Sequence, residues 1–180
     1  MCKCIGKYVR PKQDLPKFLF YKRGVNTVMK PPQSEYFVFS TSGDGNWGEF
    51  VCHKMQIPQR KDYNGPSIAV DFIWSKKQNC GLGTAMIDFI KNLSKRTGCN
   101  GHVILFADGF VNPNRIPHPF YRKQGFSSLN RKTDNQIDSF IKRKTPATTK
   151  DLPSMLMYYP PIKEKENFLK RFFKTIQRIL

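Results

Sequence analysis

The first candidate for a functional site in this sequence is a turn that contains two glycines. Its sequence is Gln78-Asn79-Cys80-Gly81-Leu82-Gly83-Thr84. At the start of a helix, such a turn leaves backbone N–H groups unpaired and lets a ligand approach where a side chain would block it. It lacks the third glycine of a dinucleotide fingerprint and the Gly-Lys-Ser/Thr of a Walker loop, so another phosphate-bearing ligand is favoured. A tight connection that binds no ligand is the alternative.

The residues on either side of the turn predict a strand and a helix. In the strand, Ala69 and Ile73 flank Asp71 on one face, and the other face carries Ile68, Val70, Phe72 and Trp74. Both faces are therefore expected to be covered, as in the middle of a sheet. The predicted helix ends at Gly98 and has an apolar stripe made of Leu82, Ala85, Met86, Phe89, Ile90 and Leu93.

A second buried strand is expected at residues 102–108. A strand, helix and strand of this length form a right-handed crossover with the two strands parallel. The ligand crevice of such a unit lies at the carboxyl ends of its strands, next to the glycine turn. The other predicted elements are a hairpin of residues 35–41 and 47–55, a short helix at 120–126 passing into an edge strand, a helix at 135–143 and a last strand at 155–159.

The two ends of the chain differ from this body, which spans residues 35–162. Residues 1–34 are basic and proline-bearing, and we expect a loose arm with one short packing element at Phe18-Leu19-Phe20-Tyr21. Residues 163–180 predict an amphipathic helix whose apolar side is Phe168, Leu169, Phe172, Phe173, Ile176, Ile179 and Leu180. We expect this helix to pack on the domain, and a helix that binds a membrane surface or a partner is the alternative.

Composition narrows the class of protein. The chain has 180 residues and is 39% hydrophobic, which suits one folded domain. Its net charge of +18 favours an anionic partner, which could be nucleic acid, a membrane surface or a phosphorylated cofactor. The five cysteines lack Cys-x-x-Cys spacing, so no metal site is expected, and Cys2 and Cys4 are left without a role. No apolar stretch reaches the ~18 residues of a membrane span, and we expect a cytoplasmic protein.

Two blocks, in this order, resemble the GNAT superfamily of N-acetyltransferases. The first, Gln78-x-x-Gly81-x-Gly83, is similar to the coenzyme loop Gln/Arg-x-x-Gly-x-Gly/Ala of that family. The second is Asn114-x-x-Pro117-x-x-Phe120-Tyr121-x-x-x-Gly125-Phe126, which is similar to the family's Asn-x-x-Ala-x-x-Leu-Tyr-x-x-x-Gly-Phe. The resemblance covers residues 35–159. It departs from the family at Pro117, which replaces an alanine, and at Cys80, where a basic residue is common.

The resemblance implies a mixed α/β fold with a splayed mixed sheet of about six to seven strands flanked by helices, and acetyl-coenzyme A held between two parallel central strands. Backbone N–H groups of the turn would bind the pyrophosphate, and Lys76, Lys77, Arg122 or Lys123 the remaining phosphate. The backbone of Ile73 would face the acetyl carbonyl. The implied coenzyme contacts are Phe72, Ile73, Trp74, Gln78, Asn79, Cys80, Gly81, Leu82, Gly83, Thr84, Asn114 and Lys123.

The implied activity is direct transfer of an acetyl group from acetyl-coenzyme A to a primary amine in a ternary complex. Tyr121 matches the family's general acid, and a phenol with a pKa near ~10 can protonate a leaving thiolate of similar basicity. A tyrosine that only packs is the alternative. Asp108 and Asp71 are candidates for holding or deprotonating the amine, and His118 is a third. No glutamate falls on the central strand, so a base of that kind is absent.

The sequence does not reveal the amine acceptor. A small molecule, a protein amine and an aminoacyl-tRNA all remain, and the last, in a toxin-like enzyme, suits the positive charge. From another class, the chain could be a non-catalytic basic module that binds nucleic acid or a membrane surface on a GNAT scaffold. Weak binding of RNA to the basic surface is expected, and homodimer formation is left open.

Overall fold

The computed structural model describes the body of the chain and the strands that precede it. These residues are 63–76, 78–110 and 112–161, with the strands Ile5–Val9 (β1), Phe18–Asn26 (β2), Ser34–Ser40 (β3) and Asn46–Gln56 (β4). Side chains are described from residue 48 onward. The predicted C-terminal helix, Lys77, Cys2 and Cys4 lie outside the described residues.

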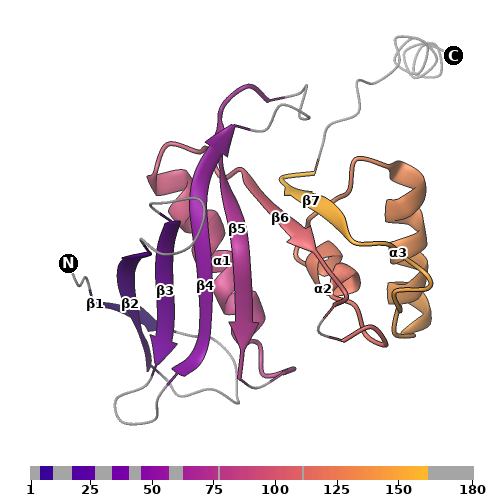
Figure 1. Cartoon of the computed structure of the whole chain (residues 1–180), viewed down its shortest axis with the longest axis horizontal. Coiled ribbons are helices and arrows are strands. Elements are labelled where there is room, and N and C mark those ends of the chain that lie inside the picture. Colours follow the sequence, from indigo (N-terminus) through magenta and orange to yellow (C-terminus); the bar gives the residue numbers. More distant parts are fainter. Residues whose placement is uncertain are drawn as a thin grey trace, which may run out of the picture.

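The strands form one mixed sheet, ordered as they follow in the chain (Figure 1). After β4 come Pro66–Ser75 (β5), Val103–Ala107 (β6) and Met155–Tyr159 (β7). Among the described strands, β5 and β6 run parallel and all other neighbours run antiparallel. The mixed α/β class, the parallel crossover, the β3–β4 hairpin and the last strand are therefore confirmed.

The strands β1 and β2 correct the expectation of a loose arm at residues 1–34. They pair antiparallel with each other, and β2 pairs with β3 from Phe20↔Ser40 to Asn26↔Ser34. The aromatic run that begins at Phe18 suits a strand. In the sequence, Pro11 and Pro16 lie outside the bounds of both strands, which suits a residue that cannot donate to a strand ladder.

Three helices lie in the described part of the chain: Leu82–Arg96 (α1), His118–Lys123 (α2) and Arg131–Arg143 (α3). In Figure 1, α1 lies behind β4 and β5, whereas α2 and α3 lie beside β6 and β7. The left-handed Gly98, with φ 80°, follows the last turn of α1 as predicted. The edge strand expected after α2 is reduced to a single bridge between Ser127 and Tyr158.

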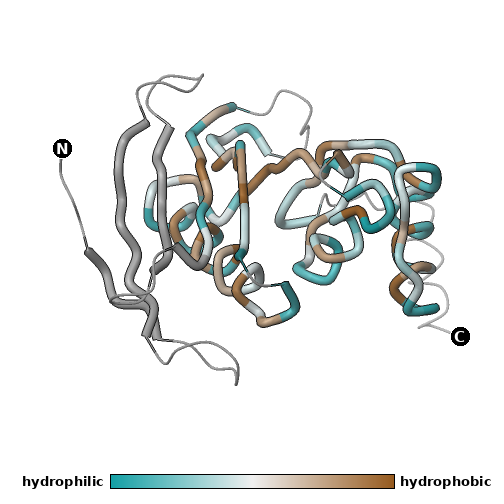
Figure 2. Tube along the Cα trace, turned by 60° about the horizontal axis from the view of Figure 1, so that its bottom comes forward, coloured by the Kyte–Doolittle hydropathy of each residue, from teal (hydrophilic) through white to brown (hydrophobic). Residues whose placement is uncertain are grey.

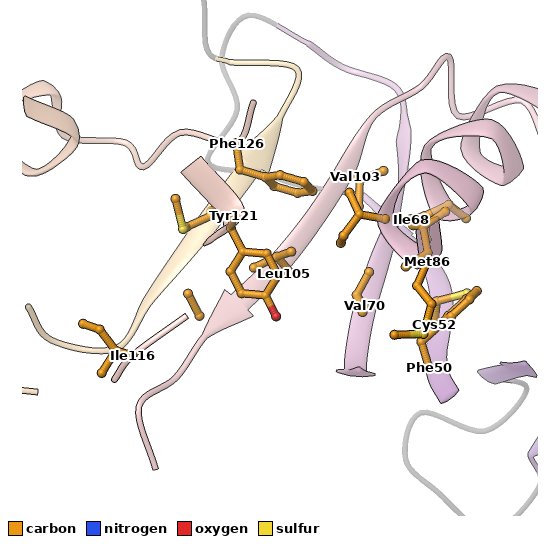
Figure 3. Close-up of a cluster of buried hydrophobic side chains, with 14 of the residues drawn as sticks. Phe50, Cys52, Ile68, Val70, Met86, Val103, Leu105, Ile116, Tyr121 and Phe126 are labelled. Carbon is orange, nitrogen blue, oxygen red and sulfur yellow. The ribbon is translucent and has the colours of Figure 1, made fainter. Parts of the chain in front are cut away.

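The main core lies on the face of the sheet that α1 covers. Side chains of β4 and β5, including Phe50 and Val70, pack there with Met86 of α1, Leu105 of β6 and Phe126 (Figure 3). Figure 2 shows hydrophobic stretches running through the middle of the described body. The same core cluster contains residues of α2 and α3, so all three helices contribute to one side of the sheet.

A β-bulge interrupts the pairing of β4 with β5. The neighbours Val51 and Cys52 on β4 pair with Phe72 and Val70 on β5, so the intervening Asp71 has no opposite residue. One extra residue shifts the alternation of side chains by one position. Every residue after Asp71 therefore faces the side opposite to the one that simple alternation predicts.

The bulge overturns one prediction for β5. Ile73, opposite the fully buried Phe50, continues the core face of Val70. Phe72 and Trp74 lie on the other face, and are 43% and 42% exposed. The prediction that they share a covered face with the first half of the strand is wrong.

Candidate active site

The two parallel strands part in the middle of the sheet. They pair at Ile68↔Val103, Ala69↔Ile104 and Val70↔Leu105. Beyond these three pairs, β5 stays attached to β4 and β6 stays attached to β7. The remaining halves of β5 and β6 therefore diverge from each other, as Figure 1 shows.

The register indicates which backbone groups of β5 face this parting. Ile68 donates its N–H to the carbonyl of His102 at 3.0 Å, so Ile68 and Val70 direct their backbone groups toward β6. After the bulge, Phe50 lies opposite Ile73, and the alternation of the antiparallel ladder directs the backbone N–H of Ile73 away from β4. The backbone N–H of Ile73, which is expected to face an acetyl carbonyl, therefore points toward the gap that opens between β5 and β6.

The glycine turn starts α1 without a side-chain cap. Gly81 and Asn79 adopt left-handed conformations, with φ of 80° and 58°, and no side chain accepts a hydrogen bond from the first turn of the helix. The first helical hydrogen bond runs from Ala85 N to Gly81 O at 3.0 Å. The N–H groups between these residues are therefore open to an anion.

The side chains of the turn divide between solvent and core. Gln78 and Asn79 are exposed, whereas Cys80 and Leu82 are buried in the core. Cys80 forms no disulfide and is 6% exposed. It can offer a ligand only its backbone, so it does not replace the basic residue that is common at this place in the family.

Helix α2 lies against the first turn of α1. The ring of Phe120 comes within 3.1 Å of the point where Gly83 would carry a Cβ, and the Gln124 side chain donates from Nε2 to Thr84 Oγ1 at 3.2 Å. Lys91 adds a third link, because its Nζ donates to Gln124 O at 2.7 Å. Packing against α2 therefore requires a glycine at position 83.

Tyr121 lies in the core beside the parting. It is 6% exposed and packs edge-on against Phe120, with 5.2 Å between ring centroids. Figure 3 shows its ring beside Leu105, the last β6 residue that pairs with β5, and its hydroxyl pointing away from Phe126. Burial alone raises the pKa of Tyr121 to about 12. At neutral pH the phenol is therefore protonated and can donate a hydrogen bond.

Asp108 and His118 form a second polar group after the end of β6. Asp108 Oδ1 accepts hydrogen bonds from Ser154 Oγ at 2.6 Å and from Phe110 N at 3.1 Å, and these bonds, the first above all, hold the pKa of the exposed carboxyl below its usual value. His118 is fully buried, with Nε2 at 3.1 Å from the carbonyl of Pro153, and burial lowers its pKa. Asp108 is thus an ionised carboxylate, suited to hold an ammonium group.

Asp71 is paired with a histidine on the other face of the sheet. Its Oδ2 lies 2.8 Å from Nδ1 of His53 on β4, and the side chains of the pair are 28% and 18% exposed. His53 pairs with Ala69, whose side chain lies outside the core cluster that contains Tyr121. Asp71 and Tyr121 therefore lie on opposite faces of β5. Sequence reasoning missed His53, because nothing local indicates that the bulge brings it to Asp71.

The predicted phosphate contacts also separate. Arg122 donates from Nε and Nη2 to the two carboxylate oxygens of Asp138, both at 2.8 Å, so its guanidinium is turned toward α3. Lys123, Asn114 and Lys76 are exposed. Of the described side chains predicted to contact a phosphate, Lys76 and Lys123 are therefore the ones that the structure leaves exposed to solvent.

No family model and no curated protein matches this chain. Within the described residues, no three histidine, cysteine or acidic side chains come together to hold a metal ion. None of α1, α2 and α3 has the length and apolar character needed to cross a membrane. The functional assignment therefore rests on the residues themselves.

Proposed function

We propose that the protein is an acetyl-coenzyme A-dependent N-acetyltransferase of the GNAT kind, which transfers the acetyl group directly to a primary amine. The observation that carries the proposal is the parting of β5 and β6, which pair over three residues and then diverge beside Tyr121. A long thioester that ends in phosphates needs an opening in the sheet and an anion site near it. The splayed sheet of six to seven strands that the resemblance implies belongs to this proposal.

In this proposal, the diphosphate binds at the start of α1. The uncapped N–H groups after Gly81 and the positive end of the helix dipole supply the attraction. Lys123, exposed at the end of α2, adds a positive charge. The thioester arm then lies between β5 and β6, where the N–H of Ile73 can donate to the acetyl carbonyl oxygen as negative charge develops on it.

Tyr121 acts on the leaving sulfur. A phenol with a pKa of about 12 is a poor source of a proton for a thiolate, whose conjugate thiol has a pKa of ~8.5 in cysteine. Its contribution is therefore a hydrogen bond to the sulfur as the carbon–sulfur bond breaks, given in an apolar setting where such a bond is strong. This refines the expectation that the tyrosine fully protonates the thiolate.

The carboxylates differ in what they can offer the amine. Asp108 is held by Ser154 and by a backbone N–H, so it can hold an ammonium but is a weak base. Asp71 is paired with His53, and the pair contains a nitrogen that can accept a proton. In this proposal, Asp108 and Asp71 thus keep the roles for which their places in the sequence make them candidates, Asp108 in holding the amine and Asp71 in helping to deprotonate it.

The test is acetyl transfer to a panel of primary amines, followed by mass spectrometry of the products. Tyr121→Phe should lower kcat by roughly 10²-fold or more, because the hydroxyl acts only as the sulfur leaves, and should leave acetyl-coenzyme A affinity unchanged. Tyr159→Phe is the matched control, since Tyr159 belongs to the same aromatic cluster, and its kcat should match the wild type. An equal loss of kcat and affinity in Tyr121→Phe would mark a packing residue, and the absence of any acetylated product would refute the proposal.

A further inference from the structure

The sheet face away from α1 is aromatic and acidic around the bulge. Phe72 and Trp74 are exposed there, and the residues opposite them on β4 are Val51 and Glu49. Together with Asp71, this strip holds two carboxylates beside two exposed aromatic rings, and Glu49 is already engaged in an interaction of its own. It therefore has the composition of a surface that attracts a cation.

Neither β4 nor β5 places a basic side chain on this strip. β5 contains no lysine or arginine, and β4 contains one, Lys54. Lys54 points to the opposite side, where its Nζ donates to the carbonyl of Thr97 at the end of α1. Along β4 and β5 the residues of this strip are therefore acidic or uncharged, although the net charge of the chain is +18.

The His53–Asp71 pair has the arrangement of a general base. A carboxylate cannot donate, so Nδ1 of His53 carries the proton that Asp71 Oδ2 accepts at 2.8 Å. In the neutral imidazole, this arrangement leaves the lone pair on Nε2, and the side chain of His53 is 18% exposed. A histidine oriented in this way can take a proton from a substrate and release it to solvent.

We propose that this face binds the acceptor as an alkylammonium ion and that His53 removes a proton from it. The inference rests on the proposed acetyltransferase function and names its acceptor class. The rings of Phe72 and Trp74 contact the cation, and Asp71 balances its charge. An acceptor carried on a polyanion would bring phosphates to the Asp71 carboxylate, so a compact aliphatic amine is favoured over an aminoacyl-tRNA.

The protons balance as follows. The alkylammonium gives one proton to His53 Nε2, and the neutral nitrogen uses its lone pair to attack the acetyl carbonyl carbon. The carbon–sulfur bond breaks with its electron pair on sulfur, and the sulfur takes the second proton that the nitrogen loses, while Tyr121 donates a hydrogen bond to it. The products are the acetamide and the coenzyme thiol, and the first proton leaves His53 for solvent.

Binding of the cation can be tested without acetyl transfer. The chain has two tryptophans, so Trp47→Phe leaves Trp74 as the single tryptophan, whose emission can be excited selectively over that of the tyrosines. Choline should change the fluorescence of this protein, and its uncharged carbon isostere dimethylbutanol should not. In the same background, Phe72→Ala and Asp71→Asn should weaken choline binding by about tenfold. Leu129→Ala, which removes an exposed apolar side chain outside the strip, should leave it unchanged. Equal binding of both probes, or of choline to all variants, would overturn the cation site.

The proton transfer is tested by chemical rescue. With acetyl-coenzyme A and n-butylamine, His53→Ala should lower kcat by roughly 10²- to 10⁴-fold, and imidazole added to the buffer should restore part of it. Tyr121→Phe should gain nothing from imidazole. Wild-type turnover in His53→Ala, or equal effects of imidazole on both variants, would overturn the role of His53. A wild-type protein that binds choline but acetylates no amine would refute the acetyltransferase function and the proton transfer, and would leave the cation site standing.

Discussion

Burial gives Tyr121 two properties that an exposed tyrosine lacks. Its hydroxyl keeps its proton far above neutral pH, because the apolar core disfavours the phenolate. It also lies in surroundings of low dielectric, where a hydrogen bond to a developing charge is stronger than in water. The residue is thus suited to stabilise charge on sulfur without becoming charged itself.

Raising the pH should destabilise the protein through Tyr121. The folded pKa of about 12 exceeds the ordinary value of 10.0, so the folded state holds this proton more tightly than the unfolded state. The contribution is fully present below pH 10 and is lost as the pH rises toward 12, which amounts to roughly 2.7 kcal/mol for two pKa units. Urea unfolding across this range measures it. Tyr121→Phe removes the contribution and keeps all other titrations, so identical pH slopes in the two proteins would contradict the burial of this phenol.

At the scale of elements, the bulge in β5 decides which side chains face the core under α1 and which face the opposite side of the sheet. Sequence alternation could not reveal it, because both the even and the odd positions of residues 68–74 carry apolar side chains. The pattern of apolar residues therefore fits the strand equally well with and without a shift of one residue. The pairing of His53 with Asp71 depends on the same shift. By contrast, the limits of α1 could be predicted, because Gly81 and Gly98 mark them locally.

The neighbouring basic residues Arg122 and Lys123 on α2 should have separate roles. Arg122→Gln should lower the free energy of unfolding by about 1 kcal/mol, since it breaks a partly exposed bidentate pair with Asp138, and should leave acetyl-coenzyme A affinity unchanged. Lys123→Gln should leave stability unchanged and weaken the affinity several-fold. Chemical denaturation and calorimetry on both variants separate these effects. A loss of coenzyme affinity in Arg122→Gln with full stability would instead assign the phosphate contact to Arg122.

For the whole molecule, the sequence predicts the fold class and the order of the central elements but not the extent of the sheet. The helix and the buried strands from residue 66 onward have strong periodic patterns. β1 and β2 do not, because their strand character depends on the pairing of β1 with β2 and of β2 with β3. Long-range pairing of this kind leaves no local signal.

The C-terminal segment offers a test at the same scale. Removing residues 164–180 should lower the melting temperature, because the seven apolar residues of this segment each stabilise by roughly 1.5 to 3 kcal/mol if buried on the domain. Differential scanning calorimetry of the full and shortened chains measures the change. An unchanged melting temperature together with lost binding to anionic vesicles would assign the segment to a membrane surface instead.

The central claim, that this chain binds acetyl-coenzyme A at the glycine turn, is tested most directly by calorimetry with three proteins. Gly81 and Gly98 both have φ of 80°, so alanine strains each backbone alike, but Gly98 follows the opposite end of α1, away from the glycine turn. Acetyl-coenzyme A should bind the wild type and Gly98→Ala with equal affinity, and Gly81→Ala at least about tenfold more weakly, because a methyl group and a strained turn disturb the N–H groups that hold the diphosphate. No binding to the wild type, or equal binding to all three proteins, would contradict the account.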